Sequence, residues 1–144
     1  MRVYLASAYA TRDSLRAYAD ELSRIGMVCT SRWLNDETPI SAGTIGAATS
    51  IADAQVRKHV LDDFEDIHSA NVLILFTESA TGQRGGGGRH VETGYALAKG
   101  KKVVVIGKPE NVFHRGSPQC TVVSDWHEAV LTLVAMRNTE PQAK

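Results

Sequence analysis

The chain has 144 residues, a length typical of one domain. Its residues are 43% hydrophobic and 22% charged, which allows a sizeable buried core and excludes a disordered chain. Lys plus Arg and Asp plus Glu both number 16, so the formal net charge is zero, whereas a surface that binds a nucleic-acid polymer normally has a basic excess. We therefore expect no nucleic-acid partner.

Five apolar segments rich in β-branched residues alternate with segments of helical periodicity. The predicted strands are residues 3–6, 27–30, 71–76, 103–106 and 120–123, and the predicted helices are residues 12–25, 51–69, 90–99 and 125–137. Residues 35–50 are the longest irregular stretch, which we interpret as a binding loop or lid. Residues 138–144 are expected to be a frayed tail after a domain of residues 1–137.

This alternation of strands and helices predicts a single-domain α/β fold with a five-stranded parallel sheet covered by helices on both faces. Ligands of such sheets bind outside the carboxyl ends of the strands. The loop after the first strand contains Ser7 and Tyr9, and a glycine-rich loop follows the strand at 71–76. We expect these two loops to form one rim of a binding site.

Cys29 and Cys120 are the only cysteines, too few for a disulfide scaffold or a Cys-rich zinc site. No signal peptide is recognisable, and no apolar run approaches the roughly 20 residues of a membrane span. We expect a cytoplasmic, reduced location and no membrane partner.

The four glycines at 85–88 are the most informative feature of the chain. A turn of glycines between a strand and a helix lets a ligand approach the backbone, because no Cβ is in the way. Glu92 is predicted in the first turn of the following helix, where the helix dipole favours an ionised carboxylate by about 0.3–1 kcal/mol. Such a carboxylate suits a nucleophile or general base, although an acid there also simply stabilises a helix.

Several other kinds of site are excluded by spacing. No Gly-Lys-Ser/Thr follows the glycines, Ala-Ser-Ala rather than Gly-x-Gly follows the first strand, and no Ser lies in a Gly-x-Ser-x-Gly turn. The five histidines lack metal-ligand spacing, so we interpret each as a surface residue and expect no metal and no cofactor.

After these exclusions, catalysis by carboxyl groups remains as the chemistry of the candidate site. Glu92 has a possible partner among Asp62, Asp63, Glu65 and Asp66, most of which we interpret as a solvated helix face. One nucleophilic and one protonated carboxyl group cleave glycosidic bonds through an oxocarbenium-like transition state.

Three segments together, residues 4–7, 63–72 and 88–96, resemble the nucleoside 2-deoxyribosyltransferase family, which includes deoxynucleoside 5′-monophosphate N-glycosidases. The matching order and spacing cover about residues 3–106, and the Glu-x-Gly-Tyr-Ala element at Glu92 is its most specific part. The resemblance implies a flavodoxin-like sheet, cleavage of an N-glycosidic bond and assembly into homo-oligomers.

The resemblance also implies residue roles. Glu92 would attack the anomeric carbon to give a covalent glycosyl-enzyme, Asp63 would handle the proton of the departing base, and Tyr4 matches an aromatic residue near the nucleophile. An unbroken helix over 51–69 would place Asp63 about 9 Å from its end, so we expect a helix break near Asp62. Trp33 is a candidate to stack on a base, and equally a core aromatic.

One position departs from the family pattern. Transferases of free nucleosides usually carry Asp six residues before the nucleophile and monophosphate hydrolases often carry Ser, whereas this chain has Gly86. A bare loop of Gly86, Gly87 and Gly88 beside Arg84, Arg89 and His90 suits a phosphate. This loop favours a nucleotide substrate, and the expected activity remains that of a deoxyribosyltransferase that acts on a nucleoside or nucleotide. The alternatives are a nucleotide N-glycosidase and, in another class, a non-catalytic nucleotide-binding protein.

Overall fold

The computed structural model describes residues 1–36 and 53–141. Most of the predicted loop at 35–50, the first two residues of the helix predicted at 51–69 and the last three of the predicted tail therefore lie outside the described residues.

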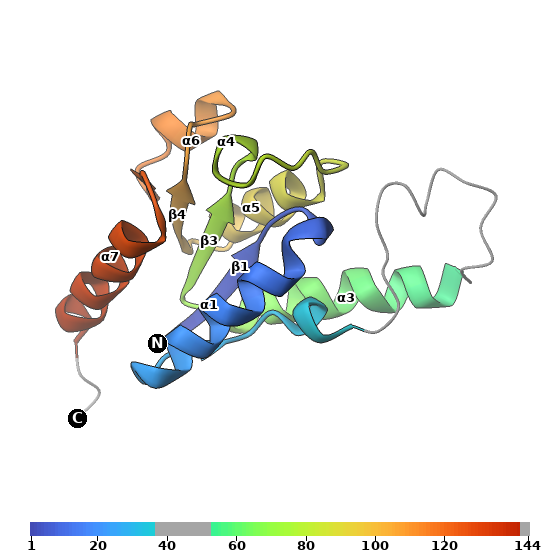
Figure 1. Ribbon diagram of the computed structural model, residues 1–144, viewed down its shortest axis with the longest axis horizontal. Helices are drawn as coiled ribbons and strands as arrows, with labels where there is room; N and C mark the ends of the chain where they lie inside the picture. Colours follow the sequence, from blue (N-terminus) through green and yellow to red (C-terminus); the bar gives the residue numbers. More distant parts are fainter. Residues whose placement is uncertain (37–52, 142–144) are drawn as a thin grey trace.

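One parallel sheet forms the centre of the molecule (Figure 1). Its strands are β1 (Arg2–Ala6), β2 (Val28–Cys29), β3 (Val72–Phe76), β4 (Lys102–Ile106) and β5 (Cys120–Val123). Their order is β2-β1-β3-β4-β5 and every neighbouring pair is parallel. This is the doubly wound order of flavodoxin-like proteins, so the predicted fold class is confirmed. β3 is buried along its whole length because helices cover both of its faces.

The longer helices are α1 (Arg12–Arg24), α3 (Asp53–Ser69), α5 (Gly88–Ala98) and α7 (Trp126–Thr139). In Figure 1, α1 and α7 lie in front of the sheet, and α3 and α5 lie behind it. Aromatic contacts agree with this division: Tyr18 of α1 stacks on Trp126 of α7 at 4.2 Å between ring centroids, and Phe64 of α3 meets Tyr95 of α5 at 4.5 Å.

Four short elements were not predicted: η1 (Tyr9–Thr11), η2 (Arg32–Asn35), α4 (Glu78–Thr81) and α6 (Val112–Gly116). Helices of three to five residues have too few positions to show a periodicity. The Asp125 side chain caps α7, since it accepts from the Glu128 N–H. That helix continues to Thr139, two residues past its predicted end.

The start of α5 corrects the position of Glu92. The helix begins at Gly88, after Gly87 in the left-handed region at φ 89°, and not at residue 90 as predicted. No acidic residue therefore lies in its first turn, and Glu92 is in the second. Four glycines gave no side-chain signal for the start, and glycine's tolerance of positive φ let the helix begin inside the run.

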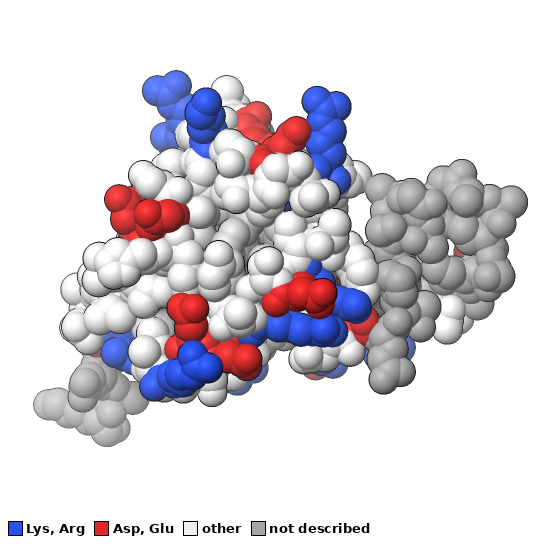
Figure 2. Space-filling model, viewed as in Figure 1, with Lys and Arg blue, Asp and Glu red and all other residues white. Residues whose placement is uncertain are grey.

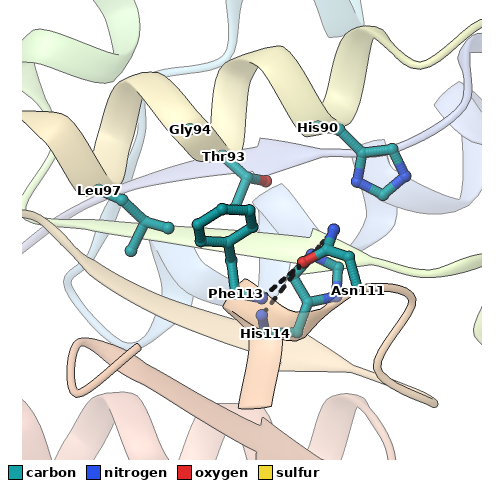
Figure 3. A pocket seen from close by; sticks show the side chains of 7 residues that line it. All are labelled: His90, Thr93, Gly94, Leu97, Asn111, Phe113 and His114. Atoms are coloured by element: carbon teal, nitrogen blue, oxygen red, sulfur yellow. Dashed lines mark hydrogen bonds between the residues drawn. The ribbon is translucent and has the colours of Figure 1, made fainter. Parts of the chain in front are cut away.

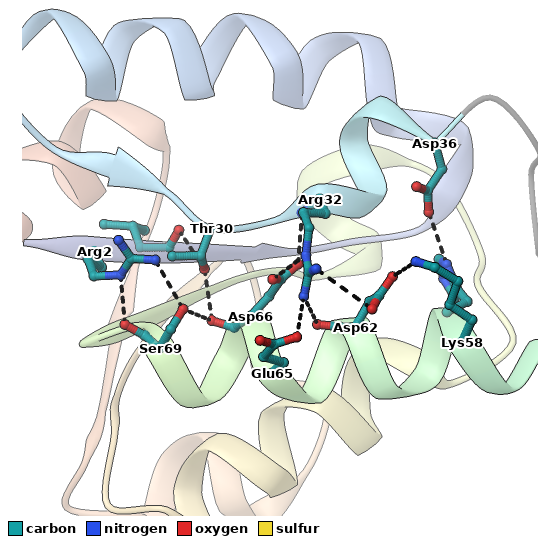
Figure 4. Close-up of polar contacts among 11 residues, drawn as sticks. Arg2, Thr30, Arg32, Asp36, Lys58, Asp62, Glu65, Asp66 and Ser69 are labelled. Atoms are coloured by element: carbon teal, nitrogen blue, oxygen red, sulfur yellow. Dashed lines mark hydrogen bonds and ion pairs between the residues drawn. The ribbon is translucent and has the colours of Figure 1, made fainter.

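α3 is unbroken from Asp53 to Ser69, so the expected break near Asp62 is wrong. A network around Arg32, shown in Figure 4, fixes this helix against the segment after β2. The Arg32 backbone N–H and Nε donate to the two oxygens of the buried Asp66 at 2.9 and 2.7 Å, and Nη2 contacts Glu65 at 2.9 Å. Asp66 is therefore not part of a solvated face, because it ties α3 to η2.

The charged groups form small mixed clusters. On the face in Figure 2, acidic and basic side chains alternate and neither sign dominates, which agrees with the zero net charge. Among the described residues, no helix is both long and apolar enough to cross a membrane.

Candidate active site

Tyr4 and Glu92 meet between β1 and α5. Tyr4 is fully buried in the middle of β1, and its hydroxyl donates to Glu92 Oε1 at 3.1 Å. Successive side chains of a strand point to opposite faces, so Tyr4 faces α3 and α5 while its neighbours Val3 and Leu5 face the other side. The predicted pairing of these two residues is thus present in the fold.

Asp63 enters the same site from α3. Its side chain is 13% exposed, and its Oδ2 lies 3.3 Å from Nε2 of His59, one helical turn earlier. The other ring nitrogen of His59, Nδ1, lies 3.0 Å from Oδ2 of Asp36, whose side chain is 41% exposed. A chain of polar groups therefore runs from the half-buried Asp63 through His59 to the more exposed Asp36.

Burial governs the protonation of this group. It raises the pKa of Glu92 to about 8, with a further rise from the nearby Asp63 and an opposing effect of the Tyr4 hydrogen bond. It also raises the pKa of Asp63 to about 6, against the lowering effect of His59. The pKa of Tyr4 is also raised, first by burial and then by the nearby charges of Glu92 and Asp63. The Tyr4 hydroxyl therefore stays a hydrogen-bond donor. The prediction that the helix dipole keeps Glu92 ionised is therefore wrong: the carboxyl group is beyond the first turn, and desolvation dominates.

The loop after β1 lies beside the glycine-rich loop, as predicted. A Cβ on Gly85 would lie 3.6 Å from Cβ of Ala8, so the two loops adjoin. Ser7 and Thr11 share a hydrogen bond at 2.7 Å between their hydroxyl groups, and Tyr9 accepts one from Arg12.

Trp33 occupies a core position. It is 5% exposed, and its Nε1 donates to the Leu5 carbonyl at 2.9 Å. Its ring lies 6.2 Å from that of Tyr9. This geometry agrees with the interpretation of Trp33 as a core aromatic. Tyr9, which is half-buried at the rim, is the more accessible aromatic side chain.

The three cationic residues beside the glycines do not form one cluster. Arg89 is 7% exposed, and its Nη2 binds Glu110 at 2.9 Å, while Nη1 lies 2.9 Å from the position of a Cβ on Gly85. Arg84 pairs with Glu78 at the surface, and His90 lies near His114, with 5.7 Å between ring centroids. Within the described part of the chain, the N–H groups of Gly86, Gly87 and Gly88 donate to no acceptor.

Three residues of the site were not predicted from the sequence: His59, Asp36 and Glu110. Spacing of four between His59 and Asp63 on a helix places them on one face, which is a usable signal for that pair. Asp36 and Glu110 come from distant segments, so only the fold brings them in. The interpretation of every His as a surface residue is wrong for His114, which is 1% exposed. The described residues contain no cluster of three or more His, Cys, Asp or Glu side chains suited to a metal ion.

Neither a family model nor a curated protein sequence matches this chain. Several solved structures share its fold, including the following two. One is a CMP N-glycosidase, BcmB, of Clostridium botulinum, with a TM-score of 0.56, 17% sequence identity, and alignment over 94% of this chain and 99% of that one. The other is a 2-deoxyribosyltransferase of Bacillus psychrosaccharolyticus, with a TM-score of 0.64, 17% identity and 90% of both chains aligned. These two proteins match the family that the sequence motifs resemble.

Burial of Glu92 predicts a stability that depends on pH. The folded state keeps the Glu92 proton up to about pH 8, whereas the unfolded chain releases it near the ordinary pKa of 4.5. Between these values the folded state binds more protons, so stability falls as pH rises. Glu92→Gln removes this penalty, and we expect the gain in melting temperature over the unsubstituted protein to be larger at about pH 9 than at about pH 5.

Thermal unfolding followed by circular dichroism at both pH values measures this difference. Glu78→Gln, on the exposed α4, is the matched control and should shift the melting temperature by a similar small amount at both. A Glu92→Gln gain that does not depend on pH would contradict a raised pKa.

Proposed function

We propose that this protein cleaves the N-glycosidic bond of a 2′-deoxynucleoside or its 5′-monophosphate, with Glu92 as the nucleophile, and transfers the glycosyl group to a second base. The observation that carries the proposal is the meeting of the half-buried Glu92 and Asp63 with the buried Tyr4. Two carboxyl groups with pKa values raised into the neutral range destabilise a fold, and a protein that only binds its ligand needs neither.

The reaction needs one proton on the carboxyl pair. Glu92 as carboxylate attacks C1′, the C1′–N bond breaks with its electron pair on the base nitrogen, and Asp63 gives its proton to that nitrogen. In the second half, Asp63 takes a proton from the incoming base, whose nitrogen attacks C1′ and releases Glu92. The Tyr4 hydroxyl favours the ionised nucleophile, because it donates to Glu92 Oε1.

Asp36 and His59 give this site a route for protons. In the free protein the shared proton is on Glu92, because burial raises its pKa more than that of Asp63. In the reactive form this proton is on Asp63, so that Glu92 is ionised. His59 lies between Asp63 and the more exposed Asp36, at 3.3 and 3.0 Å. We propose that this chain of groups exchanges the Asp63 proton with solvent.

Hydrolysis of a nucleotide is the second candidate, and the glycine-rich loop favours it. The N–H groups of residues 86–88 have no acceptor within the described part of the chain, and they lie at the start of α5, where the positive end of the helix dipole favours an anion. A phosphate at this loop would put the sugar near Glu92, and water in place of a second base would complete the reaction. Assembly into homo-oligomers stays a prediction.

Glu92→Gln is expected to abolish base release while the protein stays folded. Loss of a covalent nucleophile should lower the rate by at least about three decades, or about 4 kcal/mol of transition-state stabilisation. The measurement is chromatography of free base after incubation with each deoxynucleoside and each monophosphate, with and without a second base to separate transfer from hydrolysis. Glu78→Gln should keep full activity. If Glu92→Gln retained a tenth of the rate, Glu92 would not be the nucleophile.

The pH dependence of kcat/KM tests the shared proton. The carboxyl pair becomes singly protonated when Asp63 loses its proton near pH 6, and it loses the second proton, from Glu92, near pH 8. We therefore expect a bell-shaped pH profile with limbs at these two values. Asp63→Asn should lower the rate by about 10²–10⁴-fold, and Asp62→Asn, on the Arg32 side of α3, by far less. His59→Gln removes a group that lowers the pKa of Asp63, so the acid limb should move to higher pH. A profile that is flat from about pH 5 to pH 9 would rule out the proton-sharing pair.

Variants of Arg89 and Glu110 test the hypothesis that the substrate is a nucleotide. If Arg89 contacts a 5′-phosphate, Arg89→Ala should raise KM for the monophosphate by roughly one to two decades, equivalent to a charge-assisted bond of about 1.5–3 kcal/mol, and leave the free nucleoside unchanged. Glu110→Gln frees the Arg89 guanidinium from its ion pair and should lower KM for the monophosphate. Equal effects of Arg89→Ala on both substrates would assign Arg89 a purely structural role.

A further inference from the structure

A cavity of about 410 Å³ lies between α5 and α6 (Figure 3). Its walls are His90, Thr93, Gly94 and Leu97 of α5, and Asn111, Phe113 and His114 at α6. Positions three and four apart share one side of a helix, so these α5 residues face away from Glu92, which points to Tyr4. The cavity is therefore separate from the carboxylate site.

His114, which is buried, lacks an acceptor in this cavity. Its Nδ1 accepts from the Glu110 N–H at 3.0 Å, so in the neutral ring the hydrogen is on Nε2. Burial lowers the pKa of His114, which keeps the ring neutral. Nε2 lies 3.2 Å from Nδ2 of Asn111, itself a donor. The Asn111 amide cannot turn over, because its Oδ1 already accepts from the N–H groups of Phe113 and His114 at 3.0 and 3.2 Å.

His90 adds a third polar group without a partner. Its Nδ1 is buried and has no hydrogen-bond partner in the described part of the chain. Figure 3 shows the edge of the His90 ring that carries both nitrogens turned toward Asn111 and His114. Buried polar groups nearly always find a partner, so a second molecule that supplies an acceptor would complete this group.

Gly94 leaves one wall of the cavity open. A glycine inside a helix is less stable than alanine, yet a Cβ at Gly94 would meet nothing within 4 Å. Neither a close backbone contact nor a positive φ accounts for this glycine. Around it, Leu97 and the ring of Phe113 supply apolar surface, and Phe113 is 65% exposed at the mouth.

We propose that this cavity binds a small molecule with an apolar, ring-sized body and one carbonyl or carboxylate oxygen that accepts hydrogen bonds from His114 Nε2 and Asn111 Nδ2. The body lies against Leu97, Phe113 and the open face of Gly94. The volume is within the usual range for small-molecule sites, which combine apolar walls with a few convergent polar groups. This site does not depend on the proposed N-glycosidic activity.

Titration of the ¹⁵N-labelled protein with benzamide, benzoate and toluene tests the proposal. The three probes share a ring and differ in a neutral oxygen acceptor, a charged one and none. We expect benzamide or benzoate to shift the amide signals of Thr93 and Gly94 and the side-chain amide of Asn111, with a dissociation constant of about 1 mM or tighter. Toluene should bind at least about tenfold more weakly, because it leaves the donors unpaired. The stronger of benzamide and benzoate shows whether the natural ligand is neutral or anionic.

Two variants make the test specific. Asn111→Asp keeps the oxygen that caps α6 and presents a second oxygen to His114 Nε2–H, so it should hold or raise the melting temperature while it weakens benzamide and benzoate binding by at least about tenfold. Gly94→Leu fills the cavity and should abolish binding of every probe. Val91→Leu, at a position 62% exposed on the same helix, should bind like the unsubstituted protein. Absence of binding by all probes, toluene as tight as benzamide, or unchanged binding in Asn111→Asp would each overturn the proposal.

Discussion

The burial of two carboxyl groups around one tyrosine hydroxyl is the interaction on which the rest of this site depends. Glu92 and Asp63 come from different helices and meet at the hydroxyl group of Tyr4, whose side chain projects from the middle of β1. In water each would be ionised at neutral pH, and here desolvation holds a proton on the pair. The fold tolerates this cost only if α3 and α5 are fixed at the right depth against the sheet.

Two polar anchors set that depth. On α3, Asp66 accepts two hydrogen bonds from Arg32, and a buried carboxylate held in this way fixes the rotation of the helix. Asp63, three residues earlier, is on the adjoining face and therefore points to Tyr4. On α5, the buried Arg89 pairs with Glu110, which joins the start of the helix to the segment after β4. Each anchor is on a helix that carries one of the two carboxyl groups.

The centre of the sheet could be predicted from the sequence because the buried parallel strands β1, β3 and β4 leave apolar runs. All five strands were found within one residue of their observed ends, and Glu92, Asp63 and Tyr4 were assigned to one site through the resemblance of their segments to the deoxyribosyltransferase family. The protonation of Glu92 could not be predicted, since it depends on where α5 begins and how deeply its second turn is buried. The partners of Arg89 and His59 are also decided by loops from distant parts of the chain.

α5 combines two kinds of chemistry in eleven residues. One side presents Glu92 to the sheet and α3, and the side that carries His90, Gly94 and Leu97 lines the cavity at α6. The Glu-x-Gly element of the sequence therefore divides between them, because residues two apart on a helix point about 200° from each other. On this geometry the glycine of that element lines the cavity and faces away from the carboxylates. A ligand in the cavity would contact the same helix that carries the proposed nucleophile, and it would influence catalysis only if its binding moved the start of α5.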